Sequence, residues 1–321
     1  MLELPRKTSI ENHKKMGMGD IVIEIQSLSK SFGSVQALNK IDLEIAPGIF
    51  GLIGPNGAGK TTLFRIFLSL IRPDSGTVRI FGLDVTKESL AVRKQIGVLH
   101  ERPAYPAFLT PLEYLSRMSK LYEIQRDPEE LLQTVDLLHA KDRRIGDLSA
   151  GMYQRLGLAQ SLMGSPKLVF LDEPTSNLDV TGRAQILELI MRLHKDSGTS
   201  FVISSHILSE LQTVCDSVAF LVAGTIKERG TMLEIIKKYA SNMVRIVVSD
   251  AAQLAALLTQ EPWAERIRVA GPNALTISSS LEPDIVKARV KDAISGHSIE
   301  VFDVSRASNL EDIFREVVMD A

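Results

Sequence analysis

The segment "GPNGAGKTT" (Gly54–Thr62) follows the apolar run "GIFGLI" and precedes "LFRIFLSLI", whose apolar residues recur at helical spacing. It fits the pattern G-x-x-x-x-G-K-[ST], with fixed positions at Gly54, Gly59, Lys60 and Thr61. Such a loop turns backbone N–H groups toward phosphate oxygens, and its lysine neutralises their charge. An ordinary glycine turn is the alternative, but a strand before the loop and a helix after it favour a polyphosphate site.

Composition limits what this chain can do. Its 321 residues allow two unequal domains, and 45% apolar with 24% charged residues is typical of a folded globular protein. The net charge of −2 gives no overall basic field that would draw the protein onto nucleic acid, and a single cysteine, Cys215, excludes an internal disulfide. Apolar stretches such as "SVAFLVAGTI" are shorter than the ~20 residues of a membrane-spanning helix. We expect residues 1–19 to be a loose polar tail rather than a secretory signal.

The spacing of apolar residues predicts an α/β protein. "IVIEI" and "IDLEI" alternate as half-exposed strands do, whereas "IFGLI", "KLVFLDE", "TSFVISS" and "SVAFLVA" are the continuous runs of buried parallel strands. Between the strands the pattern is helical, and at about residues 103–165 almost wholly so, which predicts a helical subdomain beside the sheet. After Gly230, strands and helices from "MVRIVVSD" to "NLEDIFREVV" predict a small α+β module, with its boundary near Met232 to Asn242.

Two adjacent acidic residues follow the run "KLVFL". Asp172 and Glu173 stand at the carboxyl end of a predicted parallel strand, the edge of the sheet at which ligands bind. Asp172 would hold Mg²⁺, and Glu173 would orient or deprotonate a water that attacks a γ-phosphate. Taken alone, the pair could equally be a solvated strand exit. The glycine-rich loop beside it favours the catalytic interpretation.

Three further segments make the pattern specific. "LSAGMYQRLGLAQSL" (148–162), "LVFLDEPTSNLD" (168–179) and "ISSH" (203–206) resemble the signature, Walker B, D-loop and switch-histidine motifs of ATP-binding cassette (ABC) proteins. The resemblance covers roughly residues 21–230. It implies the P-loop NTPase fold of ABC ATPases, with a mainly parallel sheet, an antiparallel β subdomain and a helical subdomain. The expected domains are a tail at 1–19, a nucleotide-binding domain at 20–235 and a C-terminal α+β accessory domain at 240–321.

The resemblance implies a role for each matching residue. ATP would be bound by Phe32 at the adenine and, at the phosphates, by Gly54, Pro55, Asn56, Gly57, Ala58, Gly59, Lys60, Thr61 and Thr62. Ser149 and Gly151 would cap the ATP of the other subunit through free N–H groups at a helix start, and Asp179 would lie across the dimer seam. The implied catalytic residues are Glu173, His206, Lys60 and Glu101, and the implied Mg²⁺ ligands are Thr61, Glu101 and Asp172. Taken singly, Phe32 is more typical of a core residue, His206 of a structural hydrogen-bonder and Asp179 of a helix N-cap.

The sequence departs from the family pattern in two places. Glu101 stands where the family usually has glutamine, which adds a negative charge near the expected Mg²⁺. The signature reads "LSAGM" instead of "LSGGQ", so Ala150 and Met152 replace glycine and glutamine, while the phosphate-facing serine and glycine remain. Both variants resemble those of drug-resistance-type exporter ATPases, which also carry a small C-terminal domain with a segment like "LEDIF" (310–314).

The implied function is the ATP-binding and ATP-hydrolysing subunit of an ABC transporter, with export favoured over import. Two copies, or one copy and a related subunit, would close head to tail over two Mg-ATP and drive a separately encoded transmembrane permease at the cytoplasmic face of the membrane. The permease would dock on "ERPAYPAFLTPLEYL" (101–115), in which Tyr105 and Phe108 either form an apolar loop or pack within the subdomain. The transported substrate stays open.

Two other functions remain as alternatives. A soluble ABC ATPase acting on nucleic acid or ribosomes is disfavoured because only about fifty residues separate Glu101 from the signature, which leaves no room for a long coiled coil. One glycine-rich loop and a near-neutral charge argue the same way, so no nucleic-acid partner is expected. A non-hydrolysing regulatory cassette is disfavoured because Lys60, Glu173 and His206 are all present.

Overall fold

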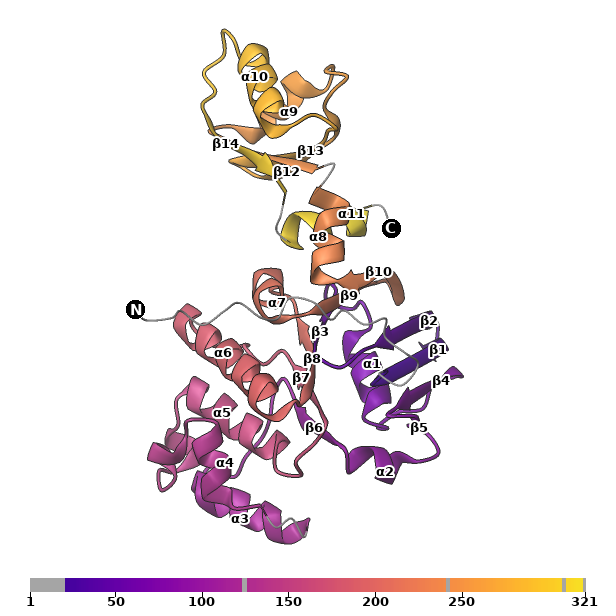
Figure 1. The fold of residues 1–321 in the computed structure, drawn as a ribbon, viewed down its shortest axis with the longest axis vertical. Helices are drawn as coiled ribbons and strands as arrows, with labels where there is room; N and C mark the ends of the chain where they lie inside the picture. The colour runs from indigo at the N-terminus through magenta and orange to yellow at the C-terminus, as the bar shows by residue number, and fades with distance from the viewer. Residues whose placement is uncertain (1–20, 123–125, 241–242, 308–309, 320–321) are drawn as a thin grey trace, which may run out of the picture.

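The computed structural model describes residues 21–122, 126–240, 243–307 and 310–319. Figure 1 shows a lower body and an upper lobe connected by helices. The body contains a six-stranded and a four-stranded sheet, and the lobe contains a second four-stranded sheet. The tail expected at residues 1–19 lies outside the described residues. Within the described ranges, no helix is both long and apolar enough to cross a bilayer.

The central sheet of the body has the strand order β10-β9-β3-β8-β7-β6. Its inner strands are the continuous apolar runs of the sequence, and β3 (Ile49–Ile53) is buried at every residue. Parallel strands are joined by crossovers that cover the faces of the sheet, so such strands are buried on both sides and read as continuous apolar runs. The other strands are β6 (Ile96–Leu99), β7 (Leu168–Asp172), β8 (Ser200–Ser205), β9 (Ser217–Val222) and the antiparallel β10 (Thr225–Thr231). The expected parallel sheet is confirmed.

An antiparallel sheet of order β2-β1-β4-β5 lies beside the central sheet. It consists of β1 (Ile23–Phe32), β2 (Val35–Ile45), β4 (Ser75–Ile80) and β5 (Leu83–Asp84), and α2 (Ser89–Arg93) follows it. Helix α1 (Lys60–Phe67) packs in the core that the two sheets share. There the rings of Phe64 and Phe67 lie with their centroids 5.6 and 5.4 Å from that of Phe170 on β7. Each such ring pair stabilises the fold by about 1 kcal/mol beyond its buried area.

Helices fill the opposite face of the central sheet. Helices α6 (Val180–Ser197) and α7 (Leu208–Val214) share one core with the helical subdomain. That subdomain consists of α3 (Pro111–Leu121), α4 (Pro128–Thr134), η1 (Leu138–Ala140), η2 (Ile145–Asp147) and α5 (Ala150–Ser161). A capping box starts α3, because Thr110 Oγ1 accepts from the Glu113 N–H while the Glu113 carboxylate accepts from the Thr110 N–H.

Tyr105 and Phe108 differ in their surroundings. The Tyr105 ring packs with centroids 5.1 Å from Tyr114 and 4.8 Å from Tyr153, and burial raises the pKa of its hydroxyl. For Tyr105, the alternative of packing within the subdomain is therefore correct. Phe108 is 71% exposed, so it stays available at the surface.

The upper lobe is an α+β unit with the strand order β12-β13-β11-β14. Its antiparallel strands are β11 (Met243–Val248), β12 (Glu265–Gly271), β13 (Ala274–Ser278) and β14 (Val301–Arg306). Helices α9 (Ala251–Leu258) and α10 (Pro283–Ala293) lie on one face of this sheet, as Figure 1 shows. Alternate residues of β11, namely Val244, Ile246 and Val248, are buried in the core beneath these helices.

The last helix leaves the lobe, which the sequence does not predict. Helix α11 (Leu310–Met319) lies beside α8 (Met232–Ala240) in Figure 1 and packs against α7 and β9. Ile313 is fully buried in the core of the body, and the Phe314 ring lies 5.8 Å from that of Phe220. The same helix also contacts the lobe. Asp312 is 2% exposed, and its carboxylate accepts a hydrogen bond from Arg245 Nη1 of β11 at 3.1 Å. Helix α11 thus connects the lobe to the body.

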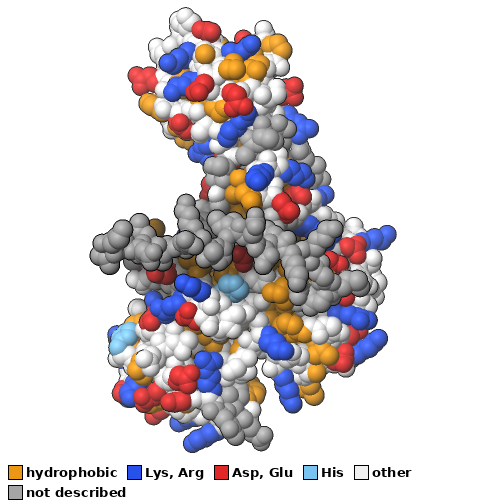
Figure 2. Space-filling view, in the orientation of Figure 1, with side chains coloured by type: hydrophobic (Ala, Val, Ile, Leu, Met, Phe, Trp, Pro, Cys, Tyr) orange, Lys and Arg blue, Asp and Glu red, His pale blue; other side chains and the backbone are white. Residues whose placement is uncertain are grey.

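Charges of the two signs are mixed over the face drawn in Figure 2, where Lys and Arg side chains alternate with Asp and Glu. This distribution agrees with a net charge of −2.

We predict that Asp312→Asn lowers the free energy of unfolding by about 2 kcal/mol, because a buried carboxylate loses its charge-assisted hydrogen bond with Arg245, whose side chain is 33% exposed. Urea denaturation followed by circular dichroism measures this change. The control is Glu282→Gln, which removes a carboxylate that is 75% exposed and lies 3.4 Å from Arg306, and it should change stability by less than about 1 kcal/mol. Equal effects from the two substitutions would show that α11 is not held by this pair.

Candidate functional site

The glycine-rich loop connects β3 to α1 and forms one wall of a cavity of about 350 Å³. Gly59, the N-cap of α1, has φ 108°, and a Cβ there would lie 2.5 Å from the Ala37 carbonyl oxygen, so only glycine fits. The cavity is lined by Val35, Gln36, Ala37, Pro55, Asn56, Gly57, Ala58, Gly59, Lys60, Thr61, Thr62, Glu101, Asp172, Glu173, Ser176 and His206. The structure therefore brings the loop, the acidic strand end and the histidine together.

Lys60 is held inside the loop. Its Nζ donates to the carbonyl oxygens of Gly54 at 2.6 Å and Pro55 at 3.1 Å. Burial lowers the pKa of this ammonium, although the carboxylates of Glu173 and Asp172 oppose the shift. The lysine is thus a buried cation that can exchange carbonyl partners for phosphate oxygens.

The ends of β7 and β8 position the two acidic residues. Asp172 pairs in register with Ser204, and Ser204 Oγ donates to Asp172 Oδ1 at 2.6 Å. The same hydroxyl oxygen accepts from the Glu173 N–H at 3.1 Å, and Ser204 is fully buried. One serine therefore holds the carboxylate of Asp172 and the backbone of Glu173. The sequence analysis missed it, although its position in "ISSH", just before the strand end, was a usable signal.

Glu173 carries the features of a general base. Its φ of 50° lies in the left-handed region, which a residue with a Cβ adopts at a cost, often at functional sites. Burial raises the pKa of its carboxyl, while the hydrogen bond from His206 acts in the opposite direction. Glu173 Oε2 and His206 Nδ1 are 2.8 Å apart, and the His206 side chain is 59% exposed.

Glu101 lies between two cavities. It lines the loop cavity and also a neighbouring one of about 340 Å³, and Thr61 and Asp172 belong to both linings. The second cavity is otherwise lined by Phe64, Arg65, Leu68, Leu70, His100 and Arg102. The Glu101 carboxylate lies 3.5 Å from Arg102 Nε, and its side chain is about half exposed.

Five expected site residues do not line the loop cavity. One is Gly54, at the start of the loop, where a Cβ would lie 2.3 Å from the Leu221 carbonyl oxygen. Ser149 and Asp179 are the N-caps of α5 and α6, because their side chains accept from the Met152 N–H at 3.3 Å and the Gly182 N–H at 2.7 Å. Gly151 lies in the first turn of α5. Phe32 is 48% exposed beside Lys30, whose Nζ lies 5.4 Å from the ring centre. The N-cap interpretation of Asp179 is therefore correct, and the core interpretation of Phe32 is wrong.

Residues 38–176 match the family model described as "ABC transporter". The chain is 34% identical over 280 residues to the daunorubicin/doxorubicin resistance ATP-binding protein DrrA of Streptomyces peucetius, an alignment covering 85% of this chain and 82% of that protein. The chain belongs to the ATP-binding proteins of ABC transporters. The bacitracin transport ATP-binding protein BcrA of Enterococcus faecalis is 36% identical to it over 222 residues, 68% of this chain and 72% of that protein.

A solved ABC structure agrees with the family assignment. The protein cbiO1 from Clostridium perfringens, part of the ABC transporter complex cbiONQ, has a TM-score of 0.62 at 25% identity, covering 68% of this chain and 94% of that one. The ABC ATPase fold expected from the sequence is thus confirmed. ABC ATPases bind ATP and couple its hydrolysis to transport, and ABC cassettes dimerise and pair with transmembrane components.

We predict that Ser204→Ala lowers the ATPase rate by about ten- to a hundredfold, the usual effect of removing a group that orients ligands or catalytic residues. Steady-state phosphate release measures it. Ser200→Ala is the matched control, because Ser200 is a buried serine on the same strand that accepts from the Gly48 N–H at its other end. If both variants lost activity equally, general weakening of β8 would explain the result.

Proposed function

We propose that this ABC ATPase drives an exporter as one of two cassettes that close head to tail over two Mg-ATP. One observation carries the proposal: the chain's own cavity contains Lys60, Glu173 and His206 but not Ser149, Gly151 or Asp179. These three residues stand at helix N-termini, where free N–H groups and the helix dipole favour a phosphate. A second copy, or a related subunit, would bring them to the nucleotide.

Export is supported by the relatives. One is named for daunorubicin and doxorubicin resistance, and another, from Rhizobium meliloti, is named for Nod factor export and is 32% identical to this chain over 301 residues. We extend the direction of transport, but no particular cargo, to this chain. In this proposal the permease is a separate chain that spans the membrane. This chain would bind the permease at the cytoplasmic face.

The cavity residues support hydrolysis of the bound ATP. The carboxylate of Glu173 would accept a proton from the attacking water, and its raised pKa strengthens it as a base. His206, hydrogen-bonded to Glu173, would hold that carboxylate toward the γ-phosphate. Lys60 would exchange the Gly54 and Pro55 carbonyl oxygens for phosphate oxygens. Phe32, exposed near the cavity, would stack on the adenine.

A magnesium ion fits the oxygen donors of this cavity. The Thr61 hydroxyl and the Asp172 and Glu101 carboxylates line the same space, and Mg²⁺ prefers such hard oxygen ligands together with phosphates. Bound there, Mg²⁺ would neutralise charge on the β- and γ-phosphates. Glu101 would supply a second carboxylate where the family pattern has a neutral amide.

The second cavity is our candidate for the permease contact. Leu70 is 56% exposed at its rim, and Phe108 is exposed on the segment expected to dock. Since Thr61, Glu101 and Asp172 also line the nucleotide cavity, a permease segment seated there would sense the occupancy of the Mg-ATP site. We further propose that residues 20–235 form the nucleotide-binding domain and residues 240–321 the accessory domain, whose last helix, α11, packs against the nucleotide-binding domain.

We predict that Glu173→Gln lowers ATP hydrolysis by about two to four orders of magnitude, because the water loses its base. Dimerisation in Mg-ATP should persist in this variant, and the closed dimer should accumulate because its ATP is not hydrolysed. Analytical ultracentrifugation with Mg-ATP detects this dimer. Glu188→Gln, on the exposed face of α6, is the matched control and should hydrolyse at the parent rate. Parent-level hydrolysis by Glu173→Gln would refute the assignment of the base.

We also predict the pH dependence of hydrolysis. A base acts when deprotonated, so the rate falls as the pH drops through the raised pKa of Glu173. The hydrogen bond from His206 lowers that pKa, so His206→Ala should move the acidic limb of the rate profile to higher pH. Phosphate release measured across pH tests this shift, with His139→Ala, an exposed histidine outside the cavity, as control. A limb that moved to lower pH would contradict the prediction.

A further inference from the structure

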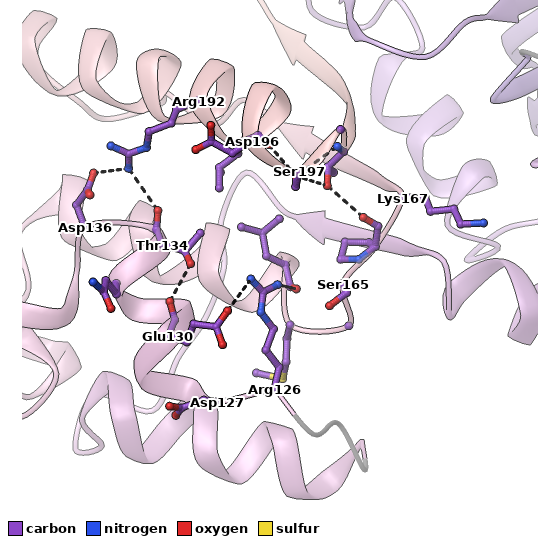
Figure 3. A pocket seen from close by; sticks show the side chains of 18 residues that line it. Arg126, Asp127, Glu130, Thr134, Asp136, Ser165, Lys167, Arg192, Asp196 and Ser197 are labelled. Atoms are coloured by element: carbon purple, nitrogen blue, oxygen red, sulfur yellow. Dashed lines mark hydrogen bonds and ion pairs between the residues drawn. The ribbon is translucent and has the colours of Figure 1, made fainter.

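A groove of about 1220 Å³, lined by both charged and apolar residues, lies where α4, α6 and the connection from α5 to β7 meet, as Figure 3 shows. None of the expected ATP-binding residues lines it. Asp136, at its edge, has φ 57°. This left-handed conformation suits glycine and is unfavourable for most residues with a Cβ, although aspartate tolerates it better than others. A charged side chain therefore stands at a position where the backbone alone would favour glycine.

The Asp136 carboxylate connects three helices. Its Oδ2 accepts from Arg155 Nη1 of α5 at 2.9 Å and from Arg192 Nη2 of α6 at 2.7 Å. The same two arginines donate to carbonyl oxygens at the end of α4, Arg155 to Val135 at 2.9 Å and Arg192 to Thr134 at 3.3 Å. Partial burial acts to raise the pKa of Asp136, but the charges and hydrogen bonds of Arg192 and Arg155 hold it below its ordinary value. The carboxylate is therefore ionised at neutral pH.

The two helices joined here both begin with residues that would contact the second nucleotide in the proposed dimer. Ser149 caps α5 six residues before Arg155, about 9 Å along the helix axis. Asp179 caps α6 thirteen residues before Arg192, about 20 Å along its axis. A helix transmits a displacement of one end to the other because its backbone is rigid over this length. The angle between α5 and α6 therefore sets the spacing between the two N-termini.

We infer that Asp136 is a positioning residue for the nucleotide of the opposite subunit: it locks α5 to α6, so that Ser149, Gly151 and Asp179 approach that nucleotide as one rigid arm. The inference rests on the head-to-tail dimer proposed above. Asp136 lies outside the nucleotide cavity and acts only through the two helices it joins. The ion pairs of Asp136 with Arg155 and Arg192 offset the unfavourable left-handed backbone conformation of Asp136.

The test uses the full chain carrying Glu173→Gln, so that ATP stays bound. Asp136→Gly removes the carboxylate and relieves the backbone, and Asp136→Asn removes the charge in a residue that also tolerates positive φ. We expect the dimer dissociation constant in Mg-ATP to rise about fivefold, as for the loss of a half-exposed ion pair. The affinity of the dilute monomer for a fluorescent ATP analogue should stay unchanged, and Asp136→Gly should keep the parent melting temperature.

Arg192→Gln removes the ion pair between Asp136 and α6 but keeps the one with Arg155 of α5. It gives an independent test if an Asp136 variant fails to fold. It should weaken the dimer to a similar extent, and the double variant should add little, because both changes remove one shared interaction. Asp196→Asn, which changes the same charge on a residue lining the groove, and Ser165→Gly, which relieves another positive φ there, are controls expected to dimerise normally.

Three results would overturn the inference. Asp136→Gly could dimerise as the parent does, or Asp196→Asn could weaken the dimer equally, which would make the effect one of charge alone. The Asp136 and Arg192 variants could also all lose melting temperature and monomer ATP affinity in parallel with dimer affinity. That result would show that Asp136 only stabilises the fold. If the Glu173→Gln parent itself stayed monomeric and the unmodified chain hydrolysed no ATP, the proposed function would fail first.

Discussion

The parallel register of the central sheet places Asp172 of β7 opposite Ser204 of β8. Because successive residues of a strand face opposite sides of the sheet, a shift by one residue would turn Asp172 away from its serine. The register is held by apolar burial: Leu168 and Phe170 belong to the core on one face of β7, and Val169 and Leu171 to the core on the other. With both faces fixed, the polar groups at the strand ends have a single arrangement. Hydrophobic packing thus determines the chemistry of this site.

In the dimer proposed above, the site that results would be half of a catalytic centre. The loop cavity collects a buried ammonium from the start of α1, and a carboxyl of raised pKa and a histidine that directly follow β7 and β8. The signature serine and the D-loop aspartate, by contrast, sit on helices outside that cavity and at present cap their own N-termini. Each of these caps occupies one hydroxyl or carboxylate but leaves other N–H groups of the first turn unpaired within the helix. The separation of the two halves gives a physical reason for a cassette to work in pairs.

Local sequence patterns predicted most of the fold and the residues of the nucleotide cavity. Unbroken apolar runs such as β3 mark buried strands, and a glycine loop with one lysine has few other uses. The features that escaped prediction depend on contacts between distant segments. The segment "ISSH" marks Ser204 as polar near a strand end, but its contact with Asp172 exists only once β7 lies beside β8. The Tyr105 ring likewise meets Tyr114 and Tyr153 only in the folded subdomain. The left-handed backbone of Asp136 is likewise invisible in a sequence, because nothing local distinguishes it from an ordinary helix end.

The position of α11 bears on how the chain folds during translation. The Leu310 N–H donates to the side chain of Gln212 on α7, 98 residues earlier, and Ile313 and Phe314 cover apolar residues of the body. At about 5–20 residues per second, a ribosome needs roughly 5–20 s to make the intervening stretch. During that interval α7 and β9 have been synthesised, but α11 does not yet cover them. The nascent chain therefore exposes apolar side chains that chaperones can bind. The upper lobe is synthesised within the same interval, so it can fold before α11 has been made. Helix α11 would then pack last, onto a body that is already folded.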